Sequence, residues 1–370
     1  MKIAILADPV DSQAAGVHTF TREMILSLLK HDSRNSYFLF RRRRTPSFEG
    51  ARSVVIPKLR WTILFPALRI FFIFGRLAKK LRIDLVIEPA HFGPFRMPKS
   101  VKRVTVIHDL TPLKYPEHHR FFSQLLQNIF LKRIVRKADL IITNSENSRQ
   151  DIIRFFPFAE EKVEKIYLGN DDTFQPDPNP EVLKKYNLEH PYFLFVSTLE
   201  PRKNLSLLLK AYQRFRMNNP SAVSLVIAGA RGWKCRRLFR ELNEHPYKEH
   251  IILPGYVPKS DLPALYTNSL AFIYPSVYEG FGLPVLEAMA CGAPCLVSNV
   301  SSLPEVAGNA ALMFNPFDIT DLTEQMELVA KDPELRNELS ARAIRQAAKF
   351  SWDNFATGLL EVLRRHDLIK

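Results

Sequence analysis

The sequence predicts an α/β protein made of two doubly wound, Rossmann-like domains that face a cleft. Three observations carry this prediction: a length of 370 residues, short apolar runs that alternate with helical patterns, and a proline-rich stretch at 176–180 after which the alternation begins again. Single hydrophobic cores stop growing near ~250–300 residues, so the length favours two domains. Strands that alternate with helices indicate a parallel sheet with helices on both faces.

The first half contains five apolar runs that suit buried strands. These are KIAILA (2–7), YFLF (37–40), DLVIE (84–88), RVTVIH (103–108) and DLIITNS (139–145). Helical patterns separate them, with HTFTREMILSLLK at 18–30 and FFSQLLQNIFLKRIVRKA at 121–138. The spacing of the apolar residues thus changes repeatedly between that of a strand and that of a helix, which is typical of β-α repeats. We expect a first domain over residues 1–175.

The stretch PDPNP at 176–180 suits neither a helix nor a central strand, so we interpret it as a linker. Strand and helix patterns follow, and we expect a second domain over residues 176–350. The predicted strands and helices are YFLFVST, NLSLLLKAYQRF, SLVIAGA, HIILPGY, LAFIYPS, LPVLEAMAC and APCLVS. SWDNFATGLLEVLRRH is an amphipathic pattern that starts at a serine cap. We expect residues 351–370 to form a helix that packs on the first domain.

The composition is that of a soluble globular protein, with 46% hydrophobic and 24% charged residues. No apolar run reaches the ~18 residues that a membrane helix needs, and MKIAILADPV lacks the features of a secretory signal. We therefore expect a cytoplasmic protein. Cys235, Cys291 and Cys295 are too few and too irregularly spaced for a disulfide framework, so we interpret them as small buried thiols.

The positive charge is concentrated in the first half. The chain has a net charge of +14; residues 1–150 hold 27 Lys and Arg against 11 Asp and Glu, whereas the rest has a net charge of −2. Such a split indicates something about partners rather than fold. Nucleic-acid binding is one interpretation, but no interleaved aromatic and basic module typical of such proteins is present.

The segment 272–299 holds the main candidate site. It places Glu279, two glycines and Glu287 between the strand pattern 270–276 and the helix pattern 283–291. Gly280 and Gly282 allow the backbone to approach a ligand, and the N–H groups of a helix start favour phosphate. One carboxylate on each side of a diphosphate suits a ligand with hydroxyls at both ends, which is a nucleotide sugar. Surface acids near a helix start are the structural alternative.

A second strand-loop-helix pattern, STLEPRKNLSLLLKA at 197–211, contains Arg202 and Lys203 in its loop. Adjacent guanidinium and ammonium groups at a helix start form a strong clamp for diphosphate. A solvated basic pair on a turn is the alternative, because paired basic residues are common.

Several phrases together resemble the retaining nucleotide-sugar glycosyltransferases of family 4, which have the GT-B fold. They are EPRKNL, LVIAG, GYVPKSDLPALY and YPSVYEGFGLPVLEAMACGAPCLVSNVSSLPEVAGNAALMFNP, within about 192–318. In the first half, HDLTPLKYP and DLIITNSENSRQDI are similar to bacterial mannosyltransferases that build surface polysaccharides or lipopolysaccharide. QAAGVHTF departs from the family, because many relatives carry two adjacent glycines in this loop.

The resemblance implies roles for individual residues. Arg202 and Lys203 would bind the diphosphate, Glu279 the hydroxyls of the donor sugar, and Glu287 the ribose hydroxyls. Backbone N–H groups of Gly280, Phe281, Gly282 and Leu283 would lie near sugar and phosphate, and the backbone of Tyr256 and Val257 near the base. His108 would contact the sugar and Gly16 the phosphates; a structural histidine and a turn glycine are the alternatives. Asp109 is interpreted as a structural cap of the next turn.

The resemblance also implies a reaction without a metal ion or other cofactor. The donor phosphate would help to deprotonate the acceptor, so no protein base is assigned and no D-x-D signature is needed. The expected donor is GDP-mannose, with a UDP-sugar as the less favoured choice. The acceptor would be a glycan or a lipid-linked glycan at an anionic membrane surface, with no nucleic acid involved. The alternative function is a GT-B nucleotide-sugar epimerase.

The stretch 61–83 combines apolar residues with Arg69, Arg76, Lys79, Lys80 and Arg82. It suits either a core helix or a helix in a membrane interface. In the second interpretation this cluster and Arg41–Arg44 would contact anionic lipid, and four aromatic side chains would enter the interface. These are Trp61, Phe71, Phe72 and Phe74.

Overall fold

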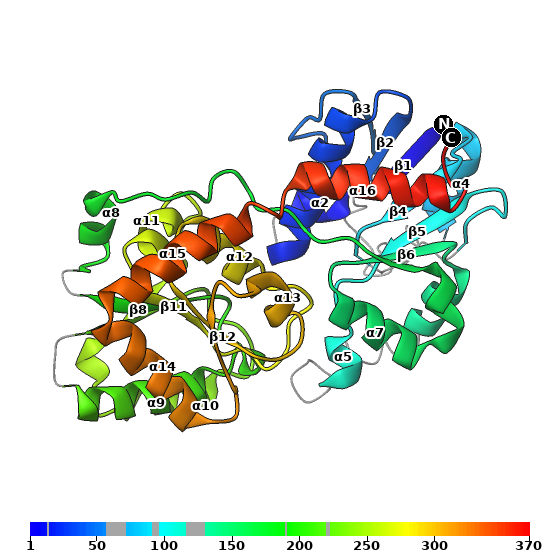
Figure 1. Cartoon of the computed structure of the whole chain (residues 1–370). Helices are drawn as coiled ribbons and strands as arrows, with labels where there is room; N and C mark the ends of the chain where they lie inside the picture. Colours follow the sequence, from blue (N-terminus) through cyan, green and yellow to red (C-terminus); the bar gives the residue numbers. More distant parts are fainter. Residues whose placement is uncertain (13–14, 57–71, 91–95, 116–129, 189–190, 220–222) are drawn as a thin grey trace. The chain divides into compact units, whose positions relative to one another are not determined.

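The protein is described by a computed structural model that covers residues 1–12, 15–56, 72–90, 96–115, 130–188, 191–219 and 223–370. The chain divides into two compact units (Figure 1). Unit 1 consists of Met1–Gly169 and Ser351–Lys370, and unit 2 is Asn170–Phe350. Each is a parallel α/β unit, as the predicted GT-B fold requires.

Unit 1 is built on a seven-stranded sheet in the order β3-β2-β1-β4-β5-β6-β7. All its strand pairs are parallel. The strands are β1 (Lys2–Leu6), β2 (Ser36–Arg41), β3 (Ala51–Val55), β4 (Leu85–Glu88), β5 (Lys102–Val106), β6 (Leu140–Thr143) and β7 (Val163–Lys165). The central strands are buried along almost their whole length, which explains why they form continuous apolar runs in the sequence.

The helices of unit 1 connect these strands and cover the sheet. They are α1 (Asp8–Ser12), α2 (Ala15–His31), α4 (Phe74–Leu81), α5 (Thr111–Lys114), α7 (Glu146–Phe155), the 3-10 helix η3 (Pro157–Lys162) and α16 (Trp352–Arg365). Helix α7 begins at Ser145, whose side chain accepts a hydrogen bond from the backbone N–H of Ser148. This is a serine N-cap.

Helix α16 lies along α2, as Figure 1 shows in red and blue, so the predicted return of the C-terminal helix to the first domain is confirmed. The side chain of Ser351 caps the helix, as expected, by accepting from the N–H of Asn354 at 3.0 Å. The rings of Phe355 and Phe20 pack edge to face with centroids 5.6 Å apart. At the rim, Lys30 and Asp353 form an ion pair at 2.7 Å.

Two of the residues predicted to contact a membrane are buried instead. Phe74 is 2% exposed, and its ring stacks on that of Phe40 at 5.9 Å. Arg41 is fully buried, and its guanidinium pairs with Asp11 at 2.6 Å. An unpaired charge inside the unit would be costly, so Arg41 serves the fold rather than the surface.

Helix α4 combines parts of both interpretations of the 61–83 stretch. Its Phe74 and Ala78 belong to the core, whereas the cations Arg76, Lys79 and Lys80 are exposed. The apolar side of α4 therefore belongs to the core, as the first interpretation predicts. The basic side is exposed, as contact with anionic lipid would require. Phe72 lies under the guanidinium of Arg96 at 4.5 Å. Trp61, Arg69 and Phe71 lie outside the described residues.

Unit 2 is built on a six-stranded sheet in the order β10-β9-β8-β11-β12-β13, again with parallel pairing. The strands are β8 (Tyr192–Val196), β9 (Ser224–Ala228), β10 (Ile251–Gly255), β11 (Ala271–Tyr274), β12 (Cys295–Ser298) and β13 (Leu312–Phe314). The order changes direction at β8 and β11. Ligands of doubly wound sheets bind at this switch point, beyond the carboxyl ends of the strands.

The helices of unit 2 pack around this sheet. They are α8 (Pro180–Lys185), η4 (Pro201–Lys203), α9 (Leu205–Asn218), α10 (Arg236–Asn243), η5 (Lys248–His250), α11 (Leu262–Thr267), α12 (Leu283–Ala290), α13 (Leu303–Ala307), α14 (Ile319–Lys331) and α15 (Pro333–Ala347). The proline-rich stretch 176–180 lies within unit 2. Its Asp177 is bound by the Thr267 hydroxyl, which accepts from the backbone N–H of Asp177 at 2.9 Å.

The three cysteines are free and buried, as predicted. Within the described parts of the chain, no helix is both long and apolar enough to cross a bilayer. In the same residues, no group of three or more His, Cys, Asp or Glu side chains is arranged to hold a metal ion.

Candidate active site

The loop between β11 and α12 turns at Gly282, which is the N-cap of the helix. Gly282 has a φ of +110°, and a Cβ atom at this position would lie 2.7 Å from Cδ2 of Leu303. Glycine therefore meets two requirements here, a left-handed backbone and a close contact. Leu283, half-buried, and Pro284 form the first turn of α12, where proline costs no hydrogen bond. The predicted strand, glycine turn and helix are all present.

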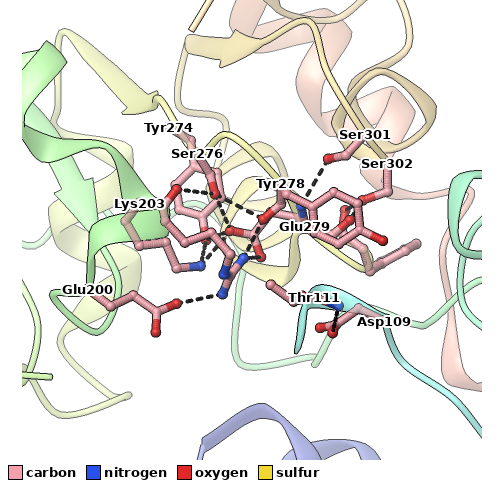
Figure 2. A network of polar contacts seen from close by, with 12 residues as sticks. Asp109, Thr111, Glu200, Lys203, Tyr274, Ser276, Tyr278, Glu279, Ser301 and Ser302 are labelled. Carbon is pink, nitrogen blue, oxygen red and sulfur yellow. Dashed lines mark hydrogen bonds and ion pairs between the residues drawn. The ribbon is translucent and has the colours of Figure 1, made fainter. Parts of the chain in front are cut away.

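Glu279 is the centre of a buried polar network at this loop (Figure 2). Its Oε1 accepts hydrogen bonds from Lys203 Nζ at 2.6 Å and Ser276 Oγ at 2.6 Å. The hydroxyl of Tyr274, 3.2 Å away, is a third donor to Oε1. Its Oε2 pairs with Arg202 at 2.7 Å. Because Oε1 already has three donors, a further hydroxyl donor from a ligand would have its place on Oε2.

The network keeps Glu279 ionised. Burial by itself would raise the pKa of this carboxyl, but the charges of Arg202 and Lys203 outweigh burial and hold the pKa at about 2. Charge-assisted hydrogen bonds to the carboxylate act in the same direction. At neutral pH the site therefore presents a fixed carboxylate, which can accept hydrogen bonds but cannot donate one.

A second loop holds the backbone of the first. The hydroxyl of Ser301 accepts a hydrogen bond from the N–H of Glu279 at 2.9 Å. The hydroxyl of Ser302 lies 2.9 and 2.8 Å from the carbonyl oxygens of Glu279 and Phe281, and its one proton is shared between these two acceptors. Gly280 and Phe281 are themselves buried. The loop 276–282 is thus fixed by residues more than 20 positions later in the chain.

Arg202 and Lys203 lie in η4, directly after β8, and both are directed at carboxylates. The guanidinium of Arg202 pairs with Glu200 Oε1 at 2.6 Å as well as with Glu279, and it also donates to the carbonyl of Tyr278. Lys203 donates to the hydroxyl of Tyr274 at 2.5 Å in addition to Glu279. Figure 2 shows Glu200, Lys203 and Glu279 converging in one cluster.

Lys203 is buried, at 6% exposure, and its environment opposes its charge. Burial lowers the pKa of its ammonium group, and the neighbouring charge of Arg202 lowers it further. The carboxylates of Glu279 and Glu200 counteract this shift. Lys203 therefore depends on these two acids for its stability as a cation.

Glu287 lies on α12, where its carboxyl is only weakly supported. The hydroxyl of Tyr266 donates to its Oε2 at 3.4 Å. Burial raises the pKa of this half-buried carboxyl to about 7, although the charge of Lys259 and the Tyr266 hydrogen bond oppose the shift. Lys259 is itself paired with Asp171, and the negative charge of Asp171 raises the pKa of Glu287 further. Glu287 thus titrates near neutral pH, unlike Glu279.

Tyr256 and Val257 follow β10 and differ in exposure. Tyr256 is 74% exposed, whereas Val257 is 5% exposed. They are positioned by Gly255, which has a φ of +74° and whose carbonyl accepts from the N–H of Gly229 at 2.7 Å. The turn at Gly255 is thus followed by one residue at the surface and one in the interior.

The candidate residues of unit 1 lie at two places. His108 follows β5, with Nε2 2.8 Å from the carbonyl of Pro89 and its ring edge to face with Phe20 at 4.6 Å. Burial lowers the pKa of His108, so the ring is neutral at neutral pH. Gly16 is exposed at the second position of α2 rather than in a loop. Asp109 caps the next turn, as predicted, by accepting from the N–H of Thr111 at 2.9 Å.

The structure therefore joins three predicted residues, Arg202, Lys203 and Glu279, in one cluster. Glu287 and the 256–257 loop have other contacts, and His108 and Gly16 belong to unit 1. Sequence reasoning missed five members of the network: Glu200, Tyr274, Ser276, Ser301 and Ser302. All five lie within the quoted motifs, but nothing in the pattern separates them from ordinary loop and strand residues.

Comparisons with known proteins show the family to which the chain belongs. The family model described as Glycosyl transferases group 1 matches residues 180–346, and the model described as Glycosyltransferase Family 4 matches residues 14–174. The chain is 38% identical over 273 residues to O-antigen chain mannosyltransferase B of Escherichia coli, a match that covers 72% of each chain. It is 26% identical over 288 residues to an O-antigen chain mannosyltransferase of Salmonella typhimurium, covering 78% of this chain and 74% of the relative.

Among solved structures, sucrose-phosphate synthase of Thermosynechococcus elongatus superposes with a TM-score of 0.79. That match is 20% identical and covers 99% of this chain and 98% of the other. At this identity the likeness concerns the fold.

Proposed function

The chain belongs to glycosyltransferase family 4, the group 1 retaining hexosyltransferases with the GT-B fold, and from this premise we propose that it is a mannosyltransferase. It would transfer mannose from GDP-mannose to a lipid-linked or free glycan during surface-polysaccharide synthesis. The observation that carries the proposal is the buried cluster in which Arg202 and Lys203 hold Glu279 at a glycine turn. The mannosyl donor is supported by the two O-antigen mannosyltransferases to which the chain is similar.

The donor would be bound mainly by unit 2. Glu279 accepts hydroxyl hydrogens of the sugar through Oε2, since Oε1 is saturated. The N–H groups of residues 280–283, at the start of α12, face sugar and phosphate. Arg202 and Lys203 supply the positive charge for the diphosphate. Glu287 receives the ribose hydroxyls, and the backbone of Tyr256 and Val257 meets the base.

Two residues of unit 1, His108 and Gly16, are proposed as further contacts of the donor. Because His108 Nε2 must carry the proton that it donates to Pro89, Nδ1 of the neutral ring is the acceptor atom that suits a sugar hydroxyl. Gly16, near the positive end of α2, suits a phosphate.

In the reaction, the bond between sugar C1 and the diphosphate oxygen breaks, and a bond from C1 to the acceptor oxygen forms on the same face. The acceptor proton passes to the leaving phosphate. The cations of the cluster stabilise the charge that develops on the diphosphate. We propose that no metal ion takes part. The protein would act in the cytoplasm, peripherally at the inner face of the membrane.

Two measurements test the donor. A thermal-shift panel compares GDP with UDP, because a ligand raises the apparent stability according to its occupancy. We expect the larger shift with GDP. Transfer from radiolabelled GDP-mannose to a lipid extract, with and without EDTA, then tests the reaction. A larger shift with UDP, together with no mannose transfer, would refute the mannosyl assignment. Conversion of the donor without any acceptor would instead favour an epimerase.

A further inference from the structure

The cluster around Glu279 contains as many acids as cations. Arg202 and Lys203 are its cations, and Glu200 and Glu279 its carboxylates. In the proposed reaction Glu279 binds the donor sugar, whereas Glu200 contacts neither the sugar nor the phosphates. A buried carboxylate beside a phosphate clamp works against the binding of a diphosphate, since like charges repel strongly where water is excluded.

Glu200 is a buried part of the cluster rather than an exposed surface acid. Its side chain is 5% exposed and pairs with the guanidinium of Arg202 at 2.6 Å. The preceding residue is fixed on both sides: the N–H of Leu199 donates to Ala230 at 2.9 Å, and its carbonyl accepts from Gly232 at 3.0 Å. The thiol of Cys235 lies 2.8 Å from the same carbonyl. The backbone next to Glu200 is therefore held in place, with the carboxylate of Glu200 on Arg202.

The two terminal nitrogens of Arg202 are divided between the two acids. NH1 pairs with Glu279 at 2.7 Å, and NH2 pairs with Glu200 at 2.6 Å. A phosphate oxygen that approaches NH2 either displaces Glu200 or shares the nitrogen with it. Displacement leaves a buried carboxylate without its cation, and sharing brings two anions together. Both outcomes weaken the grip of Arg202 on phosphate.

This weakening acts more on the product than on the donor. In the sugar donor the terminal phosphate is a diester with one negative charge, whereas in the released nucleoside diphosphate it can lose a second proton, with a pKa of about 6. A clamp with excess positive charge would therefore hold the product more tightly than the donor. Product release limits many enzymes, so such a preference would slow turnover.

We propose that Glu200 competes with the diphosphate for Arg202 and thereby promotes release of the nucleoside diphosphate product. The inference rests on the proposed function, because it assumes that Arg202 binds the diphosphate. A carboxylate that only oriented Arg202 would have the opposite effect, since its loss would weaken diphosphate binding. The two possibilities predict opposite signs for one measurement.

The test compares GDP and guanosine binding to three variants by calorimetry. Glu200→Gln keeps the shape of the side chain and an oxygen for Arg202 but removes the charge. We expect it to bind GDP about tenfold more tightly, as the removal of one buried like charge predicts, with guanosine unchanged. Arg202→Gln should bind GDP more weakly. Glu327→Gln is the control, because it removes a carboxylate of unit 2 that pairs with Lys331 on α14.

The outcomes separate the inference from the function on which it rests. Equal or weaker GDP binding by Glu200→Gln, with weaker binding by Arg202→Gln, overturns the competitor role and leaves the donor site intact. Unchanged GDP binding by Arg202→Gln overturns both the competitor role of Glu200 and the proposed contact of Arg202 with the diphosphate. A thermal melt of each variant shows whether it is folded, and product inhibition by GDP in the transfer assay gives a second measure that needs no purified complex. There, Glu200→Gln should be inhibited at about tenfold lower GDP.

Discussion

At the residue scale, the two glutamates of the candidate site occupy environments that give them different charges. The carboxyl of Glu279 has two cations within hydrogen-bond distance, whereas that of Glu287 accepts, among the described residues, only from the hydroxyl of Tyr266 at 3.4 Å. The same residue type therefore provides a permanent anion at position 279 and a carboxyl that titrates near neutrality at position 287. Different consequences are expected when each is replaced.

Glu279→Gln should lower kcat by about 100-fold or more, since it removes the charge next to the donor sugar. GDP affinity should be retained or raised, because GDP lacks the mannosyl group that Glu279 is proposed to contact and one anion has left the cluster. Glu287→Ala should instead weaken GDP binding. Calorimetry with GDP and steady-state kinetics separate these effects. Equal losses of GDP affinity in the two variants would contradict the assignment of sugar and ribose contacts.

Glu287 should also make the stability of the protein depend on pH. Its pKa is about 7 in the folded protein against 4.5 for the unperturbed group. Since the folded state holds this proton more tightly, its stabilising contribution is fully present below pH 4.5 and is lost as the pH rises through 7. Chemical denaturation at pH 5 and pH 8 measures the difference, which is at most about 3 kcal/mol for this carboxyl.

Glu287→Gln is the control for that measurement, because it cannot titrate. The variant should lose less free energy of unfolding than the natural protein between the two pH values. An identical loss in both proteins would show that Glu287 is already ionised in the folded state at pH 5.

The contacts of these residues were only partly predictable. Glu279, Arg202 and Lys203 stand out because charged residues beside glycine or proline in a strand-to-helix loop are unusual. Ser301 and Ser302 do not, since serine is common in loops and these two reach Glu279 only because β12 brings the next loop beside it. Long-range hydrogen bonds of this kind have no periodic signal in a sequence.

At the element scale, the start of α12 depends on Gly282. Gly282→Ala should destabilise the protein by about 1–3 kcal/mol, because alanine is strained at a φ of +110° and its Cβ would press on Leu303. Turnover should fall as well, since the loop carries Glu279. Denaturant unfolding and a donor-turnover assay measure the two effects.

Gly358→Ala is a matched control within helix α16. Its Cβ would lie 3.6 Å from Ile166 Cγ2, an ordinary contact. Helix propensity then favours alanine, and stability should rise by about 0.5–1 kcal/mol without a change in turnover. If both alanine variants had the same effect, backbone strain at Gly282 would not be its cause.

The strands that sequence patterns missed are β3, β7 and β13, all at or next to the edge of a sheet. β7 and β13 have only three residues each, and β3 carries charged and polar side chains. A strand paired on one side can be short and mixed in composition, so its apolar signal is weak. The central strands were correctly predicted, because they are buried on both faces and therefore form continuous apolar runs.

At the scale of the whole molecule, the basic first half leads to a prediction about membranes. With Phe74 in the core, α4 offers exposed cations rather than inserted aromatic rings. The attraction of α4 to anionic lipid should then be electrostatic, worth about 1 kcal/mol for each basic residue near the surface. We expect binding to anionic liposomes that is lost at high salt, and weak binding to neutral ones.

The variant Lys79→Glu/Lys80→Glu should reduce liposome binding, because both side chains are exposed on α4. Lys184→Glu/Lys331→Glu makes the same change of charge in unit 2 and is the control. Co-sedimentation at low and high salt, with an RNA mobility-shift assay beside it, provides the measurement. No liposome binding at low salt would refute the membrane surface and favour a soluble acceptor, whereas RNA binding alone would favour the nucleic-acid alternative.

The position of α16 in unit 1 affects how the protein is made. Phe20 of α2 packs against Trp352 and Phe355, which a ribosome adds only after all of unit 2 has been synthesised. Unit 2 is a continuous stretch of chain and can fold as it emerges. Unit 1, although it is synthesised first, leaves this side of α2 uncovered until residues 351–365 arrive. The unit begun first is thus completed last, and during that interval chaperones have an apolar surface to bind.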